Sequence, residues 1–361
     1  MQIESLHIQN VRILDNIRIT PGQTLNRIIG LNASGKTSLL EAIYILSRGR
    51  SFRTPRIHEV ITNHKDTLLV SIEGSSRNDR RIQTGIEKSR GKTCLKYNGL
   101  VVSKISQQAA NVPIILITPE SHSLISGDPK QRRLWLDWAL FHVEPGYLDH
   151  WRTYHRAYRQ RNHLLRQGIK DSKQITVWER TMEQEADVIT FMRKKFIADL
   201  RGQFVLLATE TGTPILQVQI ELQQGWAEGI NLYDALESSR EADIRTGYTR
   251  YGIHRGDVVF KQDNRSLSRA CSRGEIKQFI TILLIAQAKL LSKSLGEHPL
   301  ILLDDFASEL DVNSRKRIIR LLQGLQLQVF MTMTDAESTG TTGEDETVFH
   351  VEHGNIRKVV R

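Results

Sequence analysis

The chain has 361 residues, of which 39% are hydrophobic and 25% are charged. This length is enough for two or three domains that each bury a core, which excludes a small module held together by disulfides. The 50 Lys and Arg residues exceed the 40 Asp and Glu residues and give a formal net charge of +10, which favours a polyanionic partner.

Cysteine usage and hydropathy indicate the compartment. Only Cys94 and Cys271 are present, outside any C-x-x-C spacing, which argues against a disulfide framework and against a cysteine zinc site. No apolar run approaches the roughly 18 residues of a membrane span, and no secretory signal is visible. We therefore expect a cytoplasmic protein without a membrane partner.

The first 118 residues have the pattern of an α/β domain. Residues 1–20 alternate apolar and polar side chains and end at Pro21-Gly22, which predicts two strands closed by a turn. A short strand at Leu25–Ile29 leads into a glycine-bearing loop and a helix near Thr37–Ser47. Residues 68–96 alternate again and predict further sheet.

A helical segment interrupts this pattern. Residues 130–210 are amphipathic, and a break near Gly168 and Lys170 predicts two helices of about 36 residues, each about 54 Å long. The residues that follow a heptad rhythm are Trp178, Met182, Glu185, Ile189, Met192 and Phe196. We expect an inserted helical lobe at 119–245 between the two parts of one α/β lobe, 1–118 and 246–361, with a surface loop at 335–346.

Residues 30–37 fit the phosphate-binding pattern G-x-x-x-x-G-K-[ST] between a predicted strand and a helix. In this pattern, loop N–H groups surround phosphate oxygens, Lys36 places its charge on the β and γ phosphates, and Thr37 offers a hydroxyl to Mg²⁺. The predicted nucleotide-binding residues are Gly30, Leu31, Asn32, Ala33, Ser34, Gly35, Lys36 and Thr37. The alternative is an ordinary glycine-rich turn, which would not need a strand before it and a helix after it.

A buried-strand pattern at 300–303 ends in two carboxylates, Asp304 and Asp305. We assign Asp304 to Mg²⁺ and Asp305 to orienting or activating the attacking water. A strand that ends in two surface acids is the alternative, and the glycine-rich loop argues against it. The loop Ser308–Asp311 follows directly.

Ser272 and Gly274 resemble the signature of ABC ATPases, in which a Ser and a Gly at a helix start reach the γ-phosphate held by the other protomer. A plain helix cap would also use a Ser here. Arg12 matches a nucleotide-contacting position of this superfamily, although a lone arginine is more often solvated. The resemblance implies a site completed by dimerisation.

Thr37 and Ser272 are 235 residues apart, which is far more than transporter ATPases need. Residues 119–137, 49–54 and 304–311 resemble the RecF family, in the SMC-like branch of ABC ATPases. Three features depart from that family. Trp135 stands where the family usually has Phe or Tyr, and Ile253 stands where it usually has Pro. Residues 332–334 contain no switch His, the residue that would sense the γ-phosphate.

The resemblance implies an α/β, ABC/SMC-type P-loop ATPase head with an inserted helical lobe. It also implies weak ATPase activity, ATP and Mg²⁺ as ligands, an ATP-dependent homodimer, and DNA binding at single-strand gaps. RecR and RecO are implied as partners in loading RecA during replication-coupled repair. A different soluble ABC ATPase subunit and a nucleotide-gated clamp with negligible turnover remain as alternatives.

Positive charge is concentrated between Lys130 and Lys170, where nine Lys and Arg residues face three acids. The candidates for phosphate-backbone contacts are Arg152, Arg156 and Arg159, with Arg50 and Arg53 in a second patch. The interleaved Trp151, Tyr154 and Tyr158 have helical spacing and are expected in the core rather than stacked on bases.

Overall fold

The computed structural model describes residues 1–76, 80–169, 172–213, 217–308, 310–334 and 346–359. Two compact units divide the chain. Unit 1 comprises Met1–Ser121, Leu207–Pro214 and Arg273–Arg361, and unit 2 comprises His122–Leu206 and Ile215–Ser272. The return to unit 1 thus comes at Arg273, not at the expected 246, because β10 (Asp257–Gln262) pairs with β9 (Gln219–Gln223) in unit 2.

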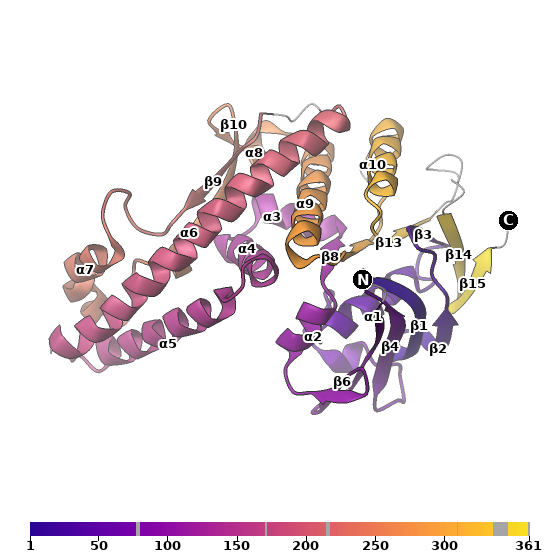
Figure 1. The fold of residues 1–361 in the computed structure, drawn as a ribbon, viewed down its shortest axis with the longest axis horizontal. Helices are drawn as coiled ribbons and strands as arrows, with labels where there is room; N and C mark the ends of the chain where they lie inside the picture. Colours follow the sequence, from indigo (N-terminus) through magenta and orange to yellow (C-terminus); the bar gives the residue numbers. More distant parts are fainter. Residues whose placement is uncertain (77–79, 170–171, 214–216, 309, 335–345, 360–361) are drawn as a thin grey trace. The chain divides into compact units, whose positions relative to one another are not determined.

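Unit 1 contains an antiparallel sheet with the strand order β2-β1-β4-β5-β6-β7. Figure 1 labels β1, β2, β4 and β6 of this sheet. Its strands are β1 (Gln2–Val11), β2 (Leu14–Ile19), β4 (Leu68–Ser75), β5 (Arg81–Lys88), β6 (Thr93–Tyr97) and β7 (Leu100–Val102). In β4 buried and less buried residues alternate, because successive side chains point to opposite faces of a sheet. The predicted sheet at 68–96 is therefore confirmed.

A second sheet of unit 1 has the order β15-β14-β3-β13-β12-β8. Its strands are β3 (Leu25–Ile29), β8 (Ile114–Ile117), β12 (Leu300–Leu303), β13 (Val329–Met333), β14 (Glu346–Glu352) and β15 (Asn355–Val359). All neighbours pair in parallel except β15 with β14. Every residue of β12 is buried, as expected for a strand of a covered parallel sheet.

Helix α1 (Lys36–Arg48) contacts strands of both sheets, including β4 and β13, and ten of its thirteen residues are buried. The other helical segments of unit 1 are α2 (Ile105–Asn111), η1 (Ile57–Glu59), α9 (Arg273–Leu295) and α10 (Val312–Gly324). Contrary to our expectation, α9 is long and apolar enough to cross a membrane by length and composition. Its window is 67% buried inside the protein, as in a core helix.

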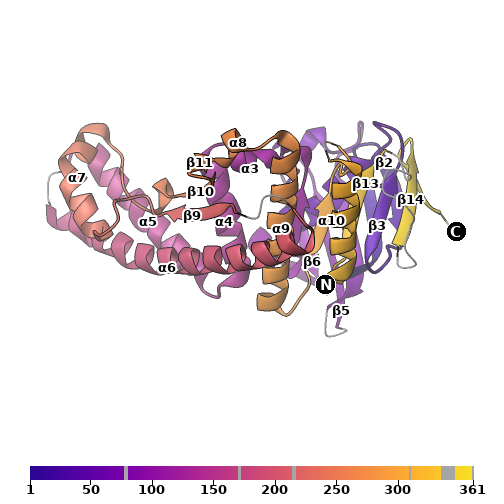
Figure 2. The same cartoon turned by 90° about the horizontal axis from the view of Figure 1, so that it is seen from above.

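Unit 2 consists of helices and a three-stranded sheet, β11-β10-β9. Its elements include α3 (Ser123–Ser126), α4 (Pro129–Val143), α5 (Tyr147–Arg166), α6 (Ser172–Glu210, which continues into unit 1), α7 (Leu232–Thr246), η3 (Ile253–Arg255), α8 (Leu267–Ala270) and β11 (Arg265–Ser266); η2 (Pro119–His122) joins the units. The first expected long helix is two helices, because Pro145 and the left-handed Gly146 (φ 83°) separate α4 from α5. Figure 2 shows α5 running alongside α6.

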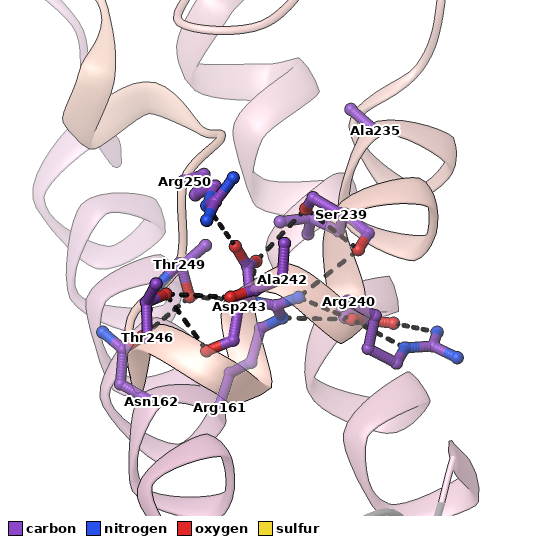
Figure 3. Close-up of polar contacts among 12 residues, drawn as sticks. Arg161, Asn162, Ala235, Ser239, Arg240, Ala242, Asp243, Thr246, Thr249 and Arg250 are labelled. Atoms are coloured by element: carbon purple, nitrogen blue, oxygen red, sulfur yellow. Dashed lines mark hydrogen bonds and ion pairs between the residues drawn. The ribbon is translucent and has the colours of Figure 1, made fainter.

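Buried charges link α5, α6 and α7 (Figure 3). Of the predicted seam, Met182, Ile189 and Phe196 are buried and the other three residues are half-buried (Trp178, Glu185 and Met192). The buried stripe of α6 also carries Glu179. Arg161 of α5 donates to Glu179 (3.0 Å) and to Asp243 of α7 (2.9 Å), and all three side chains are fully buried. The heptad pattern thus predicted a packed seam but not its charged core.

Candidate functional site

The candidate site lies where four parallel strands of unit 1 end. The carboxyl ends of such strands meet at one edge of a sheet, where ligands bind. There, the loop 30–37 follows β3, Asp304 and Asp305 follow β12, and Thr334 follows β13. Residues from these segments, together with Pro119 and Glu120 after β8, line a cavity of about 640 Å³.

The glycine-rich loop lies between β3 and α1, as its sequence predicts. Ala33 (φ 63°) and Gly35 (φ 114°) are left-handed, and Gly35 directly precedes α1, so the helix N-terminus opens on the cavity. The Lys36 amine donates to the carbonyls of Gly30 (2.8 Å) and Leu31 (2.7 Å). Burial lowers the pKa of Lys36, and the carboxylates of the acid pair oppose this effect.

The structure brings Thr37 and Asp304 together, although they are far apart in sequence. The Thr37 hydroxyl donates to Asp304 Oδ1 at 2.9 Å. Burial raises the pKa of Asp304, while hydrogen bonds from Thr332 and Thr37 oppose the rise. A hydroxyl and a carboxylate are hard oxygen donors of the kind that Mg²⁺ takes.

Thr332 is a site residue that sequence reasoning missed. Its hydroxyl donates to Asp304 Oδ1 (2.7 Å) and accepts from the N–H of Asp305 (2.8 Å). Asp305 has a left-handed backbone (φ 47°), which is uncommon for a residue other than glycine. The sequence marked 332–334 only as lacking the family's switch His, and nothing in it identified Asp304 as the partner of Thr332.

Two arginines lie at the cavity and share one acid. Arg12 forms a two-armed ion pair with the fully buried Glu41 of α1 (both contacts 2.9 Å), and this hydrogen bond raises the pKa of Arg12. Arg53 Nη1 lies 3.9 Å from Glu41 Oε2, and its exposed side chain lines the same cavity. Arg53, expected at a DNA patch, is therefore placed beside the glycine-rich loop. Glu41 gave no sequence signal.

Ser272 is exposed and directly precedes α9, as a helix cap or a signature serine would. It is the last residue of unit 2, and every residue that lines the cavity belongs to unit 1. On α9, Lys277 donates to Ser308 Oγ at 2.7 Å and so ties the helix to the loop after Asp305. Glu309 of that loop lies outside the described residues, as do residues 335–345 of the expected surface loop at 335–346, whose last residue, Glu346, begins β14.

The candidate DNA contacts separate into exposed and buried residues. Arg50, Arg152, Arg156 and Arg159 are exposed. Arg161 and Arg132, which we counted in the basic segment, are buried in ion pairs, with Asp243 and Asp257 among their partners. Lys170 lies outside the described residues. The basic segment therefore presents less charge to solvent than its composition indicates.

Of the three aromatic residues of α5 that we expected in the core, Tyr154 is buried, whereas Trp151 and Tyr158 are half-buried. Tyr154 is fully buried, its ring is stacked parallel to that of Tyr158, and its hydroxyl lies 3.0 Å from His254 Nδ1. The indole N–H of Trp151 donates to Asp137 at 3.1 Å. Burial raises the pKa of Tyr154.

The chain is similar to known proteins along almost its whole length. Residues 2–357 match the family model of the RecF/RecN/SMC N terminal domain. The DNA replication and repair protein RecF of Nitrosococcus oceani is 36% identical over 363 aligned positions that cover 100% of both chains. RecF of Thioalkalivibrio sulfidiphilus is 33% identical over 99% of both chains.

Solved structures show the same fold. A structure of the recombination mediator protein RecF with ATP, in the RecFOR pathway, has a TM-score of 0.85 at 24% identity and covers 99% of this chain and 98% of that one. An Smc head bound to the C-winged helix domain of ScpA has a TM-score of 0.57 at 15% identity, over 99% and 97%. The α/β head with an inserted helical lobe is thus confirmed.

Proposed function

This chain belongs to the RecF family of DNA replication and repair proteins, and we propose that it is an ATP-dependent, DNA-binding recombination mediator that acts at single-strand gaps. The observation that carries this proposal is the convergence of the glycine-rich loop, the Thr37–Asp304 pair and Asp305 on one edge of the parallel sheet. A cavity of about 640 Å³ is within the range of small-molecule sites.

In this proposal ATP binds with its phosphates on the loop 30–37. The N-terminus of α1 and the Lys36 amine supply positive charge for the β and γ phosphates. Lys36 would exchange its two loop carbonyl partners for phosphate oxygens, because charge-assisted bonds to an anion are stronger than bonds to a carbonyl. Arg12 and Arg53, held by Glu41, would add positive charge at the cavity wall.

Mg²⁺ fits the oxygen donors present. Thr37 and Asp304 would hold it together with phosphate oxygens and water, and the bound ion would neutralise charge on the β and γ phosphates. Asp305 would orient or activate the attacking water from its fixed backbone position. Turnover by this arrangement is proposed to be weak and coupled to assembly.

We further propose that ATP joins two copies of the chain, with Ser272 of one protomer reaching the γ-phosphate held by the other. The exposed position of Ser272 before α9 supports this role. Lys277 on the same helix would link the helix to the loop that follows Asp305. RecO and RecR remain the implied partners for loading RecA, in the cytoplasm.

DNA binding is the part of the proposal that can be tested on the surface of unit 2. The affinity for a gapped duplex should exceed the affinity for an intact duplex, and ATP should strengthen it. Changing Arg152, Arg156 and Arg159 to Ala should lower the slope of log K against log salt by roughly 0.9 for each lost phosphate contact. Fluorescence anisotropy over a range of salt concentrations measures both quantities.

A matched control changes three charges on α6 instead, at Lys194, Lys195 and Arg201, and should leave the slope unchanged. If the α5 variant keeps the wild-type slope, DNA does not bind along α5. Equal affinity for gapped and intact duplex, with or without ATP, would contradict the proposed role at gaps. Such a result would not contradict the assignment of the nucleotide site.

A further inference from the structure

Thr332 contacts three consecutive residues at the end of β12. Its hydroxyl donates to the Asp304 carboxylate and accepts from the Asp305 N–H, and its own carbonyl accepts from the N–H of Phe306 at 3.2 Å. The residue is only 1% exposed. A buried hydroxyl needs partners, and this one takes them from the neighbouring strand's end, beyond its own strand.

We propose that Thr332 is a positioning residue of the ATP site, whose single hydroxyl fixes the carboxylate of Asp304 and the backbone of Asp305 relative to each other. The inference rests on the proposed function, because Asp304 and Asp305 matter in this way only if Mg²⁺ and ATP bind beside them. It gives a role to a strand that carries no switch histidine at 332–334.

The geometry gives this role a physical basis. The left-handed backbone of Asp305 is strained and persists only where neighbouring groups hold it. The backbone N–H of Asp305 donates to the Thr332 hydroxyl, and the N–H of Phe306 donates to the Thr332 carbonyl. Asp304 Oδ1 accepts from Thr332 and Thr37 together, so the carboxylate is held from β13 and from α1 at once.

The hydroxyl can be removed with a matched pair of variants. Thr332→Ala and Thr332→Ser, made in the full chain, differ from each other by one oxygen atom. For each, the affinity for a fluorescent ATP analogue is measured with Mg²⁺ and with EDTA, and steady-state turnover is measured separately. Circular dichroism establishes that each variant is folded, and Thr332→Val, which keeps the side-chain volume, replaces the Ala variant if that one unfolds.

We expect Thr332→Ala to bind nucleotide in EDTA within about twofold of the wild type, because the glycine-rich loop is intact. The gain in affinity on adding Mg²⁺ should shrink about tenfold, and turnover should fall about 10- to 100-fold, as when groups that orient metal ligands are removed. Thr332→Ser should keep both quantities within about threefold of the wild type.

Two results would overturn the inference. One is a Thr332→Ala or Thr332→Val variant that matches Thr332→Ser in both Mg²⁺ gain and turnover. The other is equal loss in the Ala and Ser variants, since packing would then matter and the hydroxyl would not. A wild-type chain that binds no nucleotide, or gains nothing from Mg²⁺, would instead refute the proposed function, so the two failures are distinguishable.

Discussion

Lys36 is a cation kept in place by two backbone carbonyls and two nearby carboxylates. Burial lowers its pKa, and Asp305 and Asp304 oppose that shift, so the charge stays where phosphate oxygens are proposed to bind. The roles of Lys36 and Asp305 differ in kind, since one balances charge in the bound state and the other acts on water. Their variants should therefore separate binding from turnover.

Lys36→Met should lose ATP binding, because it removes the positive charge from the β and γ phosphates. Asp305→Asn should bind ATP about as well as the wild type and lose turnover, since an amide orients water poorly and cannot accept a proton. Titration with a fluorescent nucleotide and a phosphate-release assay measure the two effects. Normal ATP binding by Lys36→Met would contradict the assignment of the loop 30–37.

His254 gives unit 2 a specific dependence on pH. Burial lowers its pKa to about 4, while its hydrogen bond to the Thr249 carbonyl opposes the shift. In the unfolded chain the pKa is about 6.5, so the unfolded state binds the proton first as pH falls. The stability that the neutral ring contributes is thus present above about pH 6.5 and is lost as pH falls towards 4.

Between pH 7.5 and 4, wild-type protein should lose up to about 3 kcal/mol more stability than His254→Gln, in which this group cannot titrate. Urea unfolding of both proteins at several pH values measures the difference. Subtracting the variant's curve removes the contribution of the carboxylates, which titrate in both proteins. Parallel curves would show that His254 is charged and accommodated in the folded state.

The site residues that sequence predicted differ in kind from those that it missed. Lys36 and Thr37 lie in a contiguous motif whose backbone chemistry defines the pattern, and Asp304 ends an apolar strand. Thr332, Glu41 and the placement of Arg53 depend on contacts between segments far apart in sequence. Ordinary residue types give no local signal for such contacts, so only the folded structure reveals them.

Helices α5, α6 and α7 are joined by charges that no solvent reaches. Arg161 is fully buried between Glu179 and Asp243 and also donates to Thr249 Oγ1 at 2.8 Å (Figure 3). Removing one partner of such a group leaves uncompensated charge in the core. One buried side chain, that of Arg161, thus connects all three helices.

Arg161→Met should lower the free energy of unfolding by about 3 kcal/mol, because two buried carboxylates each lose their fully buried partner and keep, among the described ion pairs, only those with Arg240 and Arg250. The matched control is Arg159→Met, an exposed change on the same helix, which should stay within about 0.5 kcal/mol. Urea unfolding followed by helical circular dichroism measures both. A loss under about 1 kcal/mol for Arg161→Met would mean that water or rearrangement compensates the acids.

Among the secondary-structure elements, strands and motif-bearing helices were the easiest to predict. Alternation over 68–96 and the glycine-rich loop before α1 each reflect a local rule, and the structure follows both. The helical insert was harder to place. Pro145-Gly146 ends α4 where amphipathicity alone would continue, and β9–β10 pairing across a long separation keeps residues up to Ser272 in unit 2.

Unit 1 is built from both ends of the sequence, since β3 pairs with β13 and β14 in one sheet, while most of the middle of the chain forms unit 2. This arrangement places the glycine-rich loop near the start of the chain and Ser272 late in it. If Ser272 only caps α9, its loss should leave ATP-dependent dimerisation intact. If Ser272 reaches the nucleotide of a partner, its loss should prevent dimerisation. The difference can be measured by mixing variants.

Sedimentation velocity with ATP, on Ser272→Arg, on Lys36→Met and on their mixture, tests the proposed shared site most directly. Each variant alone should remain monomeric, Ser272→Arg while still binding ATP and Lys36→Met because it binds none. The mixture should form some dimer, because one of its two interfaces combines an intact loop 30–37 with an intact Ser272. Full ATP-dependent dimerisation by Ser272→Arg alone would contradict a nucleotide site shared between protomers.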